Sequence, residues 1–352
     1  MTTGTKRPSM QDVALAAGVS QATVSLVLND VADSGISEST KRRVRETATR
    51  LGYRHNAMAR GLKLQRSDTI GFISDNITIT PFAAGLIEGA QVGAREAGKH
   101  LLIVNVDYEE NRDNSDAIEH AIDELIERRV DGVIYATMFH RIVDIPRSLH
   151  ELPSVLLDAQ ATDGSLPSVV PDDLGGAMEM TMYLLGLGHR SIVHMSRALG
   201  PSAVDLRRNG FFAAHEQFGV APLTDAVIEC EVTTPAAFEA GMKLLTRSDR
   251  PTAIFCFNDR MAWGVYQAAA ELGVSIPGDV SVVGFDDVPL VAPVLRPPMT
   301  TMRLPHVEMG RWAIDRLISG NTQLEHEVLP CPLIVRESVA PPPEPERAKV
   351  AT

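Results

Sequence analysis

The chain has 352 residues, of which 44% are hydrophobic and 22% charged, as in ordinary soluble globular proteins of two or three domains. No apolar run approaches the ~20 residues of a membrane-spanning helix, and the N-terminus lacks the layout of a signal peptide, so we expect a cytoplasmic protein without a membrane partner. Its three widely separated cysteines predict free thiols in a reducing compartment.

The net charge of −12 is unevenly distributed along the chain. Residues 1–66 contain 11 Lys and Arg and 5 Asp and Glu, a net charge of +6, whereas the remainder contains 22 and 40, a net charge of −18. Because phosphate neutralisation needs positive charge only at the contact face, this asymmetry predicts a DNA-binding N-terminus on an acidic body.

Residues 9–29 predict two short helices joined by a tight turn. Ser9 is a candidate N-cap for the first helix, Gly18 supplies the turn, and Ser20 caps a second helix from about 21 to 28. A helix this short must pack on its partner at a fixed angle. An ordinary helical hairpin is the alternative, but we favour a helix-turn-helix whose second helix enters a DNA major groove.

The second helix has an inward and an outward face. Val24, Val27 and Leu28 are predicted to face inward, at helical spacing. A third helix is expected from the N-cap Ser37 to about Leu51, where it closes a small three-helix core. Four residues of the second helix are predicted to face outward: Gln21, Ala22, Ser25 and Leu26.

From Thr69 onward, short apolar runs alternate with amphipathic helical stretches. This alternation predicts parallel, doubly wound sheets, and the length of the body favours two lobes divided near 160–170. We expect the chain to cross back near 299–304 and to place a helix over 305–319 on the first lobe. The expected strands cover residues 69–74, 100–106, 131–136, 154–158, 190–195, 252–257 and 280–285. The expected helices between them lie near residues 82–97, 112–128, 173–187, 204–218 and 259–272.

The N-terminal segments Asp12-Val13-Ala14, Ala17-Gly18-Val19-Ser20, Thr23-Val24-Ser25 and Val27-Leu28-Asn29 resemble the DNA-binding motif of the lactose-repressor (LacI/GalR) family. The resemblance continues through the body to about residue 340. Further matches are Gly188-His189-Arg190, Asn258-Asp259-Arg260-Met261-Ala262, Gly284-Phe285-Asp286-Asp287 and Val335-Arg336-Glu337-Ser338.

This resemblance implies an all-α helix-turn-helix headpiece over residues 1–55 and a hinge helix or linker over 56–66. The implied effector-binding and dimerisation body, over 67–340, has a two-lobed α/β fold like that of periplasmic binding proteins, and 341–352 form a disordered tail. The lobes are expected to comprise residues 67–165 with 300–325, and residues 166–299 with 326–340.

No catalytic motif is present. The sequence has no GxGxxG after a strand, no Walker sequence, no HExxH, no GxSxG and no Cys/His cluster with metal spacing. We therefore expect no catalytic residue, no cofactor and no metal.

A ligand is instead expected in the crevice beyond the carboxyl ends of the strands. Carboxylates, an amide and a guanidinium there can pair with vicinal hydroxyls, and an aromatic ring can stack on a sugar face. The resemblance supports Arg207, Asn258 and Asp286 most strongly, whereas Asp75 and Phe139 can equally be a surface and a core residue. The candidate effector-binding residues are Asp75, Phe82, Phe139, Asp158, Arg207, Asn258 and Asp286.

The resemblance also implies contacts to DNA and to a second subunit. Leu62 of the hinge is expected to wedge into the operator minor groove. Leu26 stands where many family members carry Arg. The DNA-binding candidates are Ser20, Gln21, Ala22, Thr23, Ser25, Leu26, Asn29, Arg60 and Leu62. The dimer-interface candidates are Trp263, Tyr266 and Gln267, with a buried core position as the alternative for the tryptophan.

The predicted protein is a homodimeric, nucleoid-associated transcriptional repressor that a small sugar-like effector releases from a palindromic double-stranded DNA operator. No C-terminal heptad repeat is present, which favours a dimer over a tetramer. A corepressor-dependent regulator that responds to a nucleobase or another metabolite is the alternative. A sugar-binding protein without DNA function and a sugar-processing enzyme fit the sequence less well.

Overall fold

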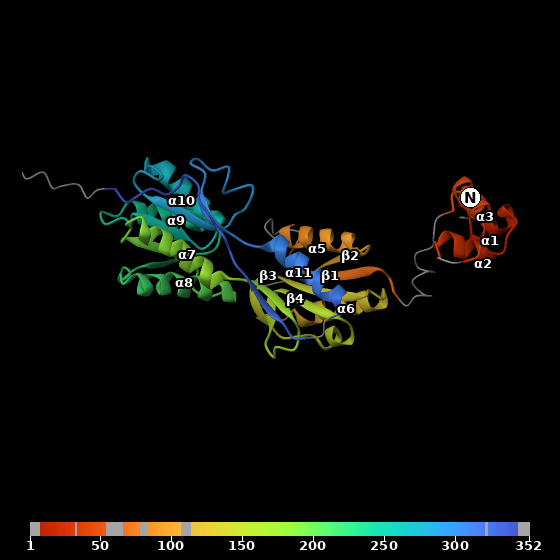
Figure 1. Ribbon diagram of the computed structural model, residues 1–352. Coiled ribbons are helices and arrows are strands. Elements are labelled where there is room, and N and C mark those ends of the chain that lie inside the picture. Colours follow the sequence, from red (N-terminus) through yellow and green to blue (C-terminus); the bar gives the residue numbers. More distant parts are fainter. Residues whose placement is uncertain are drawn as a thin grey trace, which may run out of the picture. The chain divides into compact units, whose positions relative to one another are not determined.

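The computed structural model describes residues 8–31, 34–53, 66–75, 77, 84–106, 114–320 and 323–343. The chain falls into two compact units, Met1–Ser67 and Asp68–Thr352 (Figure 1). The hinge predicted over 56–66 is almost wholly outside the described residues, and so is most of the predicted tail.

The N-terminal unit contains α1 (Met10–Ala17), α2 (Gln21–Leu28) and α3 (Glu38–Leu51). Ser9 and Asp12 form a reciprocal capping box at the start of α1, and Gly18 ends that helix with a φ of 63°. Helices α1 and α2 are bent by 104° relative to each other, within the range of helix-turn-helix motifs. All three helices confirm the predicted bounds to within a residue.

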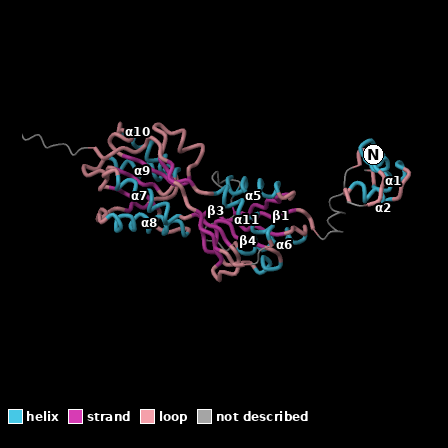
Figure 2. The backbone as a smooth tube through the Cα atoms, in the orientation of Figure 1, coloured by secondary structure: helices cyan, strands magenta, loops and turns pink. Residues whose placement is uncertain are grey.

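In the second unit, which Figure 2 shows as strands flanked by helices, the first lobe is built on a parallel sheet in the order β11-β5-β4-β3-β1-β2. Alternating side chains of the strands contribute to two separate cores, one on each face. Its strands are β1 (Thr69–Asp75), β2 (His100–Val106), β3 (Gly132–Val143), β4 (Ser154–Ala161), β5 (Ser168–Pro171) and β11 (His326–Leu329). One face packs on α5 (Ala84–Glu96) and α11 (His306–Ser319), the other on α6 (Ser115–Glu127) and the 3-10 helix η3 (Arg147–Glu151).

The second lobe has the sheet order β12-β10-β9-β8-β6-β7, parallel except for β12, which is antiparallel to β10. Its sheet is likewise covered on both faces, each by a pair of helices with its own core. Its strands are β6 (Ile192–Ser196), β7 (Val227–Glu229), β8 (Ala253–Cys256), β9 (Ser281–Asp286), β10 (Thr300–Arg303) and β12 (Leu333–Ile334). The helix pairs are α7 (Asp173–Gly186) with α8 (Ser202–Phe218), and α9 (Thr234–Leu245) with α10 (Asp259–Leu272).

The sheet topology corrects the predicted lobe boundaries. The chain crosses between lobes after β5, after β10 and after β11, so 168–171 and 326–329 belong to the first lobe and 300–303 to the second. Strand β5 pairs with both β4 and β11, a segment more than 150 residues away. Local sequence patterns do not encode such pairing, which is why the boundaries were wrong. The prediction also lacked α9, although Thr233 caps it and Pro235 stands in its first turn.

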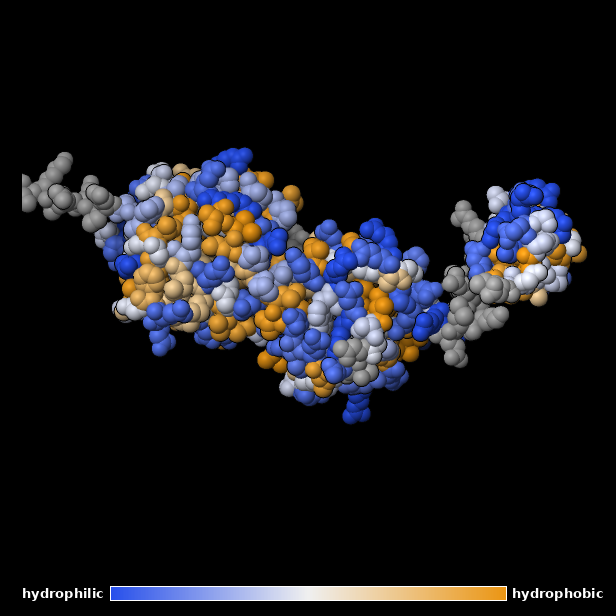
Figure 3. All heavy atoms as spheres, in the orientation of Figure 1, coloured by the Kyte–Doolittle hydropathy of each residue, from blue (hydrophilic) through white to orange (hydrophobic). Residues whose placement is uncertain are grey.

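No single described helix is long and apolar enough to cross a membrane, although the bent pair α1 and α2 would together pass a test of length and composition. Figure 3 shows polar and apolar residues interspersed over the visible face of the body, with apolar residues gathered on the second lobe.

Candidate functional site

The outward face of α2 is the candidate DNA-reading surface. Gln21 and Ala22 are exposed, and the side chain of Leu26 is 37% exposed, whereas Val24 and Val27 are buried in the core of the unit. The predicted orientation of α2 is therefore confirmed.

The polar candidates on α2 form hydrogen bonds that stabilise the two ends of this helix. The Ser20 hydroxyl accepts a hydrogen bond from the Thr23 amide at 3.0 Å and lies 2.9 Å from the Thr23 hydroxyl. At the other end, the Asn29 side-chain amide donates to the Ser25 carbonyl at 2.7 Å. Arg60 and Leu62 lie outside the described residues.

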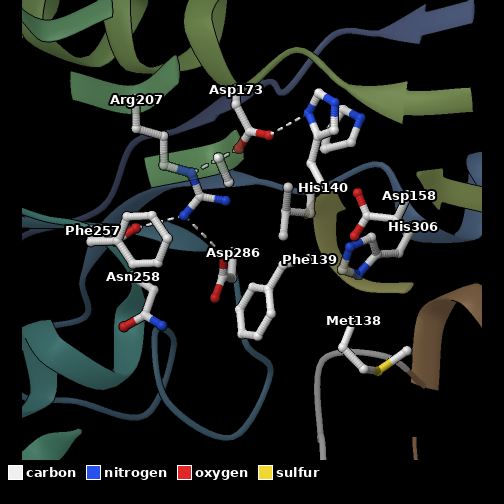
Figure 4. Close-up of a pocket in the computed structure, with 13 residues that line it drawn as sticks. Met138, Phe139, His140, Asp158, Asp173, Arg207, Phe257, Asn258, Asp286 and His306 are labelled. Carbon is white, nitrogen blue, oxygen red and sulfur yellow. Dashed lines mark hydrogen bonds and ion pairs between the residues drawn. The ribbon is translucent and has the colours of Figure 1, made fainter. Parts of the chain in front are cut away.

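A cavity lies between the lobes, at the carboxyl ends of β8 and β9 and along the C-terminal halves of β3 and β4 (Figure 4). Its empty volume is about 300 Å³, a figure that includes open solvent at the mouth. The structure brings five of the predicted effector-binding residues together in its wall: Phe139, Asp158, Arg207, Asn258 and Asp286. Phe82 lies outside the described residues.

Arg207 is the centre of the pocket wall, and its side chain is only 4% exposed. Its Nε donates to Asp173 Oδ1 at 2.8 Å, and its Nη1 donates to the Phe257 carbonyl at 2.6 Å and lies 3.5 Å from Asp286 Oδ1. The guanidinium also stacks on Phe285, with 3.7 Å between its central carbon and the ring centroid. These contacts compensate a cation that burial would otherwise penalise heavily.

Asp173 connects Arg207 of the second lobe with His140 of the first. Asp173 is the first residue of α7, directly after the chain crosses between lobes, and its Oδ2 lies 3.4 Å from His140 Nδ1. Burial opposes ionisation of Asp173, but the charge of Arg207 and hydrogen bonds from His140 and Arg207 outweigh it and lower the pKa of this carboxyl.

Two other carboxylates of the pocket are held on unusual backbone. Asp158 has a φ of 57° and Asp286 a φ of 115°, conformations that cost a non-glycine residue roughly 1–3 kcal/mol and that cluster at functional sites. Burial, and then the charge of Asp173, raise the pKa of Asp158 well above its usual range. Burial raises the pKa of Asp286 to about 7, although the charge of Arg207 opposes this shift.

Asp75 is not among the described residues that line the cavity. Its two carboxylate oxygens accept hydrogen bonds from the Met138 amide at 3.2 Å and from Arg141 at 2.5 Å. Asp75 therefore fixes the part of β3 where its pairing with β4 shifts register, a role that its position after a predicted strand did not distinguish from ligand binding.

Asn258 both caps a helix and lines the cavity. Its Oδ1 accepts a hydrogen bond from the Met261 amide at 3.0 Å and so caps α10, while the residue also lines the cavity. The neighbouring Asp259 is fully buried and binds the Thr301 hydroxyl and the Val288 amide, which ties α10 to the strand that leads back to the first lobe.

Eight of the thirteen described residues that line the pocket were not predicted, and two of them, His140 and Asp173, contact each other. His140 was not found because β3 was expected to end at residue 136, whereas it continues to Val143. Asp173 follows Asp172 directly in the sequence, and neither was predicted to line the pocket. The two carboxylates have different partners: Asp172 accepts a hydrogen bond from the Gly175 amide, and Asp173 accepts one from Arg207.

The candidate dimer surface on α10 is corrected at one position. Trp263 is 42% exposed and Gln267 is exposed, but Tyr266 is buried and its hydroxyl donates to the Pro297 carbonyl at 3.0 Å. A side chain fixed in its own core cannot contribute to a subunit contact. One helical face therefore presents Trp263 and Gln267 while the adjacent face holds Tyr266.

Within the described ranges, no group of three or more His, Cys, Asp and Glu side chains is placed to hold a metal ion. The three cysteines are free thiols.

Comparisons with known proteins cover nearly the whole chain. Residues 9–56 match the family model described as bacterial regulatory proteins of the lacI family. Residues 67–337 match the model of periplasmic binding proteins and the sugar-binding domain of the LacI family.

Two relatives and one solved structure illustrate this similarity. The ribose operon repressor of Escherichia coli (strain K12) is 34% identical over 90% of this chain and 93% of its own length. The sucrose operon repressor of Shigella flexneri is 32% identical over 93% of this chain and 98% of its own length. The crystal structure of the Lac repressor dimer bound to operator and the anti-inducer ONPF has a TM-score of 0.80, with 25% identity over 95% of this chain and all of that one. This chain, with its helix-turn-helix unit and two-lobed α/β body, belongs to the LacI family of DNA-binding transcriptional regulators.

Proposed function

We propose that the protein represses carbohydrate-related genes from a palindromic operator, as a homodimer that a small sugar releases from DNA. The observation that carries this proposal is the buried Arg207 with Asp158, Asn258 and Asp286 in a crevice between two lobes, in a chain that also has a DNA-binding unit. Such a site offers charged hydrogen-bond partners to hydroxyl groups and no arrangement that we can assign to catalysis, so we propose a regulator rather than an enzyme.

The proposed DNA contacts are the outward residues of α2, with Gln21, Ala22 and Leu26 at base edges in the major groove. Ser20, Thr23, Ser25 and Asn29 fix the ends of α2 and can contact phosphates. Two such units in a dimer fit a palindromic site, and Trp263 with Gln267 on α10 is the proposed subunit contact. Binding to chromosomal operators would place the protein in the cytoplasm at the nucleoid.

The proposed allosteric step is a change in how the lobes close. A ligand that contacts Asp158 in the first lobe and Arg207 in the second favours one arrangement of the three crossing segments. By linkage, if the effector changes the affinity for DNA by a given factor, DNA changes the affinity for the effector by the same factor. The relatives named as repressors of the ribose and sucrose operons support a sugar as the effector. A corepressor that strengthens DNA binding is the alternative.

The experiment is selection of binding sites from random DNA with the full chain, followed by titration of sugars and nucleobases into the complex. We expect a palindromic consensus and release of DNA by a sugar. Strengthening of the complex by a nucleobase would support the corepressor alternative. Failure to enrich any sequence would overturn the proposed operator function.

A further inference from the structure

The wall of the pocket carries more acid than base. Among the described residues that line it, the carboxylates are Asp158, Asp173 and Asp286, the guanidinium is Arg207, and two histidines complete the titratable groups. An anionic ligand would lose its hydration in this narrow space and would have to find a cation whose charge is not already compensated.

Arg207 is not such a cation. Its Nε is committed to Asp173 and its Nη1 to the Phe257 carbonyl, with Asp286 at 3.5 Å. Its remaining nitrogen, Nη2, has no dashed line to the other residues drawn in Figure 4. Two N–H groups there can donate to a ligand hydroxyl, but the charge behind them is balanced by two carboxylates.

Asp173 is the carboxylate that decides this balance. Asp173 is completely buried and in direct contact with Arg207. Burial raises the pKa of Asp158, and the charge of Asp173 raises it further. Burial also raises the pKa of Asp286, where the charge of Arg207 opposes the shift and the charge of Asp173 adds to it. A negative charge added to the cavity would meet the same unfavourable field.

The helix ends around the cavity differ in what they offer an anion. Asp172 caps α7 and Asn258 caps α10, so these N-termini are supplied with acceptors from the chain itself. The N-termini of α8 and α11 have no side-chain cap, and Ala203 and His306 in their first turns line the cavity. An anion in the unmodified protein could use these two N-termini, but only beside the carboxylates of the wall.

The ligand-facing acceptor lies opposite, in the first lobe. Asp158 is 3% exposed, and its Oδ1 is buried without a hydrogen-bond partner in the described structure. A buried oxygen of this kind costs stability unless a ligand donates to it. Hydroxyl and ammonium groups donate hydrogen bonds, whereas an ionised phosphate or carboxylate can only accept them.

We propose that the pocket selects an effector without negative charge, and that Asp173 imposes this selection by engaging the guanidinium of Arg207. The effector class is then an unphosphorylated polyol or its amino derivative, and sugar phosphates and sugar acids are rejected. The inference rests on the proposed effector-binding function of the pocket and adds a specificity-determining residue to it.

Inorganic phosphate is the probe that tests this selection without knowledge of the effector. It is titrated calorimetrically into the full chain, the Asp173→Asn variant and the Asp172→Asn variant. Asp172→Asn is the matched control, because it removes the same charge one residue away and keeps a residue that caps α7 equally well. It also keeps the same DNA-binding unit, so phosphate bound there cancels in the comparison.

We expect Asp173→Asn to bind phosphate at least about tenfold more tightly than the other two proteins, the gain from one charge-assisted hydrogen bond. Equal phosphate affinity in all three proteins, or pocket binding of phosphate by the unmodified chain, would overturn the proposal.

A second measurement needs no variant and stands even if Asp173→Asn does not fold. The measured quantity is the affinity of the unmodified chain for two sets of sugars. One set is D-ribose and D-ribose 5-phosphate, and the other is D-glucose, D-glucosamine and D-glucose 6-phosphate. Tighter binding of a phosphate ester than of its parent sugar would overturn the proposal, and the reverse order supports it. Operator affinity is measured on the same preparations, so a failure of DNA binding is recognised separately.

Discussion

At the scale of single residues, the proposed DNA-reading surface of α2 lacks a cation. Gln21, Ala22 and Leu26 are exposed there, while Ser20 and Asn29 are occupied by the helix ends. An apolar side chain at a base edge favours contact with a thymine methyl and leaves the acceptor pair of guanine without a donor. We therefore expect the base preference of the proposed interface to depend on Leu26 more than on electrostatic attraction.

Leu26→Arg is expected to shift the base preference at one half-site position towards guanine by ~1–3 kcal/mol, because Arg donates to guanine O6 and N7 together. Selection from random DNA with both proteins measures the shift. Leu15→Arg is the matched control, since Leu15 is 76% exposed on α1 and the substitution adds the same charge to the same unit. Identical base preferences in all three proteins would show that Leu26 does not read DNA.

Asp286 is expected to make effector affinity depend on pH. Its pKa is raised to about 7 by burial, so part of the population is protonated at neutral pH. A ligand hydroxyl donates best to the ionised carboxylate, so binding is coupled to loss of a proton. Affinity should rise by up to about tenfold per pH unit below 7 and level off above it. Calorimetry from pH 5.5 to 8.5 checks this. Asp286→Asn should remove this dependence, and an unchanged slope in that variant would assign it to another group.

At the scale of secondary-structure elements, glycines set how closely paired helices approach. A Cβ atom on Gly89 of α5 would overlap the carbonyl oxygen of Val307 in α11, and one on Gly93 would meet Ile314. Helices α5 and α11 therefore approach each other closely at these glycines. The contact matters for function because α11 lies directly after a crossing between the lobes.

Gly89→Ala is expected to lower the free energy of unfolding of the body by at least ~1–3 kcal/mol, because α5 and α11 must separate to admit the methyl group. Gly186→Ala is the control, since a Cβ at the end of α7 would meet nothing within 4 Å. It should be neutral or stabilising by up to ~1 kcal/mol. Urea denaturation compares the variants, and equal midpoints would disprove the close contact.

At the scale of the whole molecule, the two units have separate cores. The small core of α1, α2 and α3 shares none of its buried residues with the four cores of the body. The contrast in net charge between residues 1–66 and the remainder follows the same division. We therefore expect the body to fold without the DNA-binding unit.

Deletion of residues 1–66 is expected to abolish operator binding while leaving a body that unfolds cooperatively and still binds effector. Gel shift measures the first property, and thermal denaturation with and without effector measures the second. Specific DNA binding by the truncated protein would contradict the assignment of the interface to α2. Loss of cooperative unfolding would show that the units depend on each other for stability.

The sequence by itself determined the elements whose signals are local. Caps such as Ser9, Ser20 and Gly18, and apolar spacing at Val24 and Val27, depend on neighbours within one helical turn, so α1 to α3 were predicted closely, as were seven of the twelve described strands of the body apart from the end of β3. The tertiary structure alone decided what depends on distant pairing. It places β5 and β11 in the first lobe and buries Tyr266 in the core. It also pairs Asp75 with Arg141, and Asp173 with both Arg207 and His140. The physical reason is that a buried charge is defined by the partners that the fold brings to it, and those partners here come from both lobes.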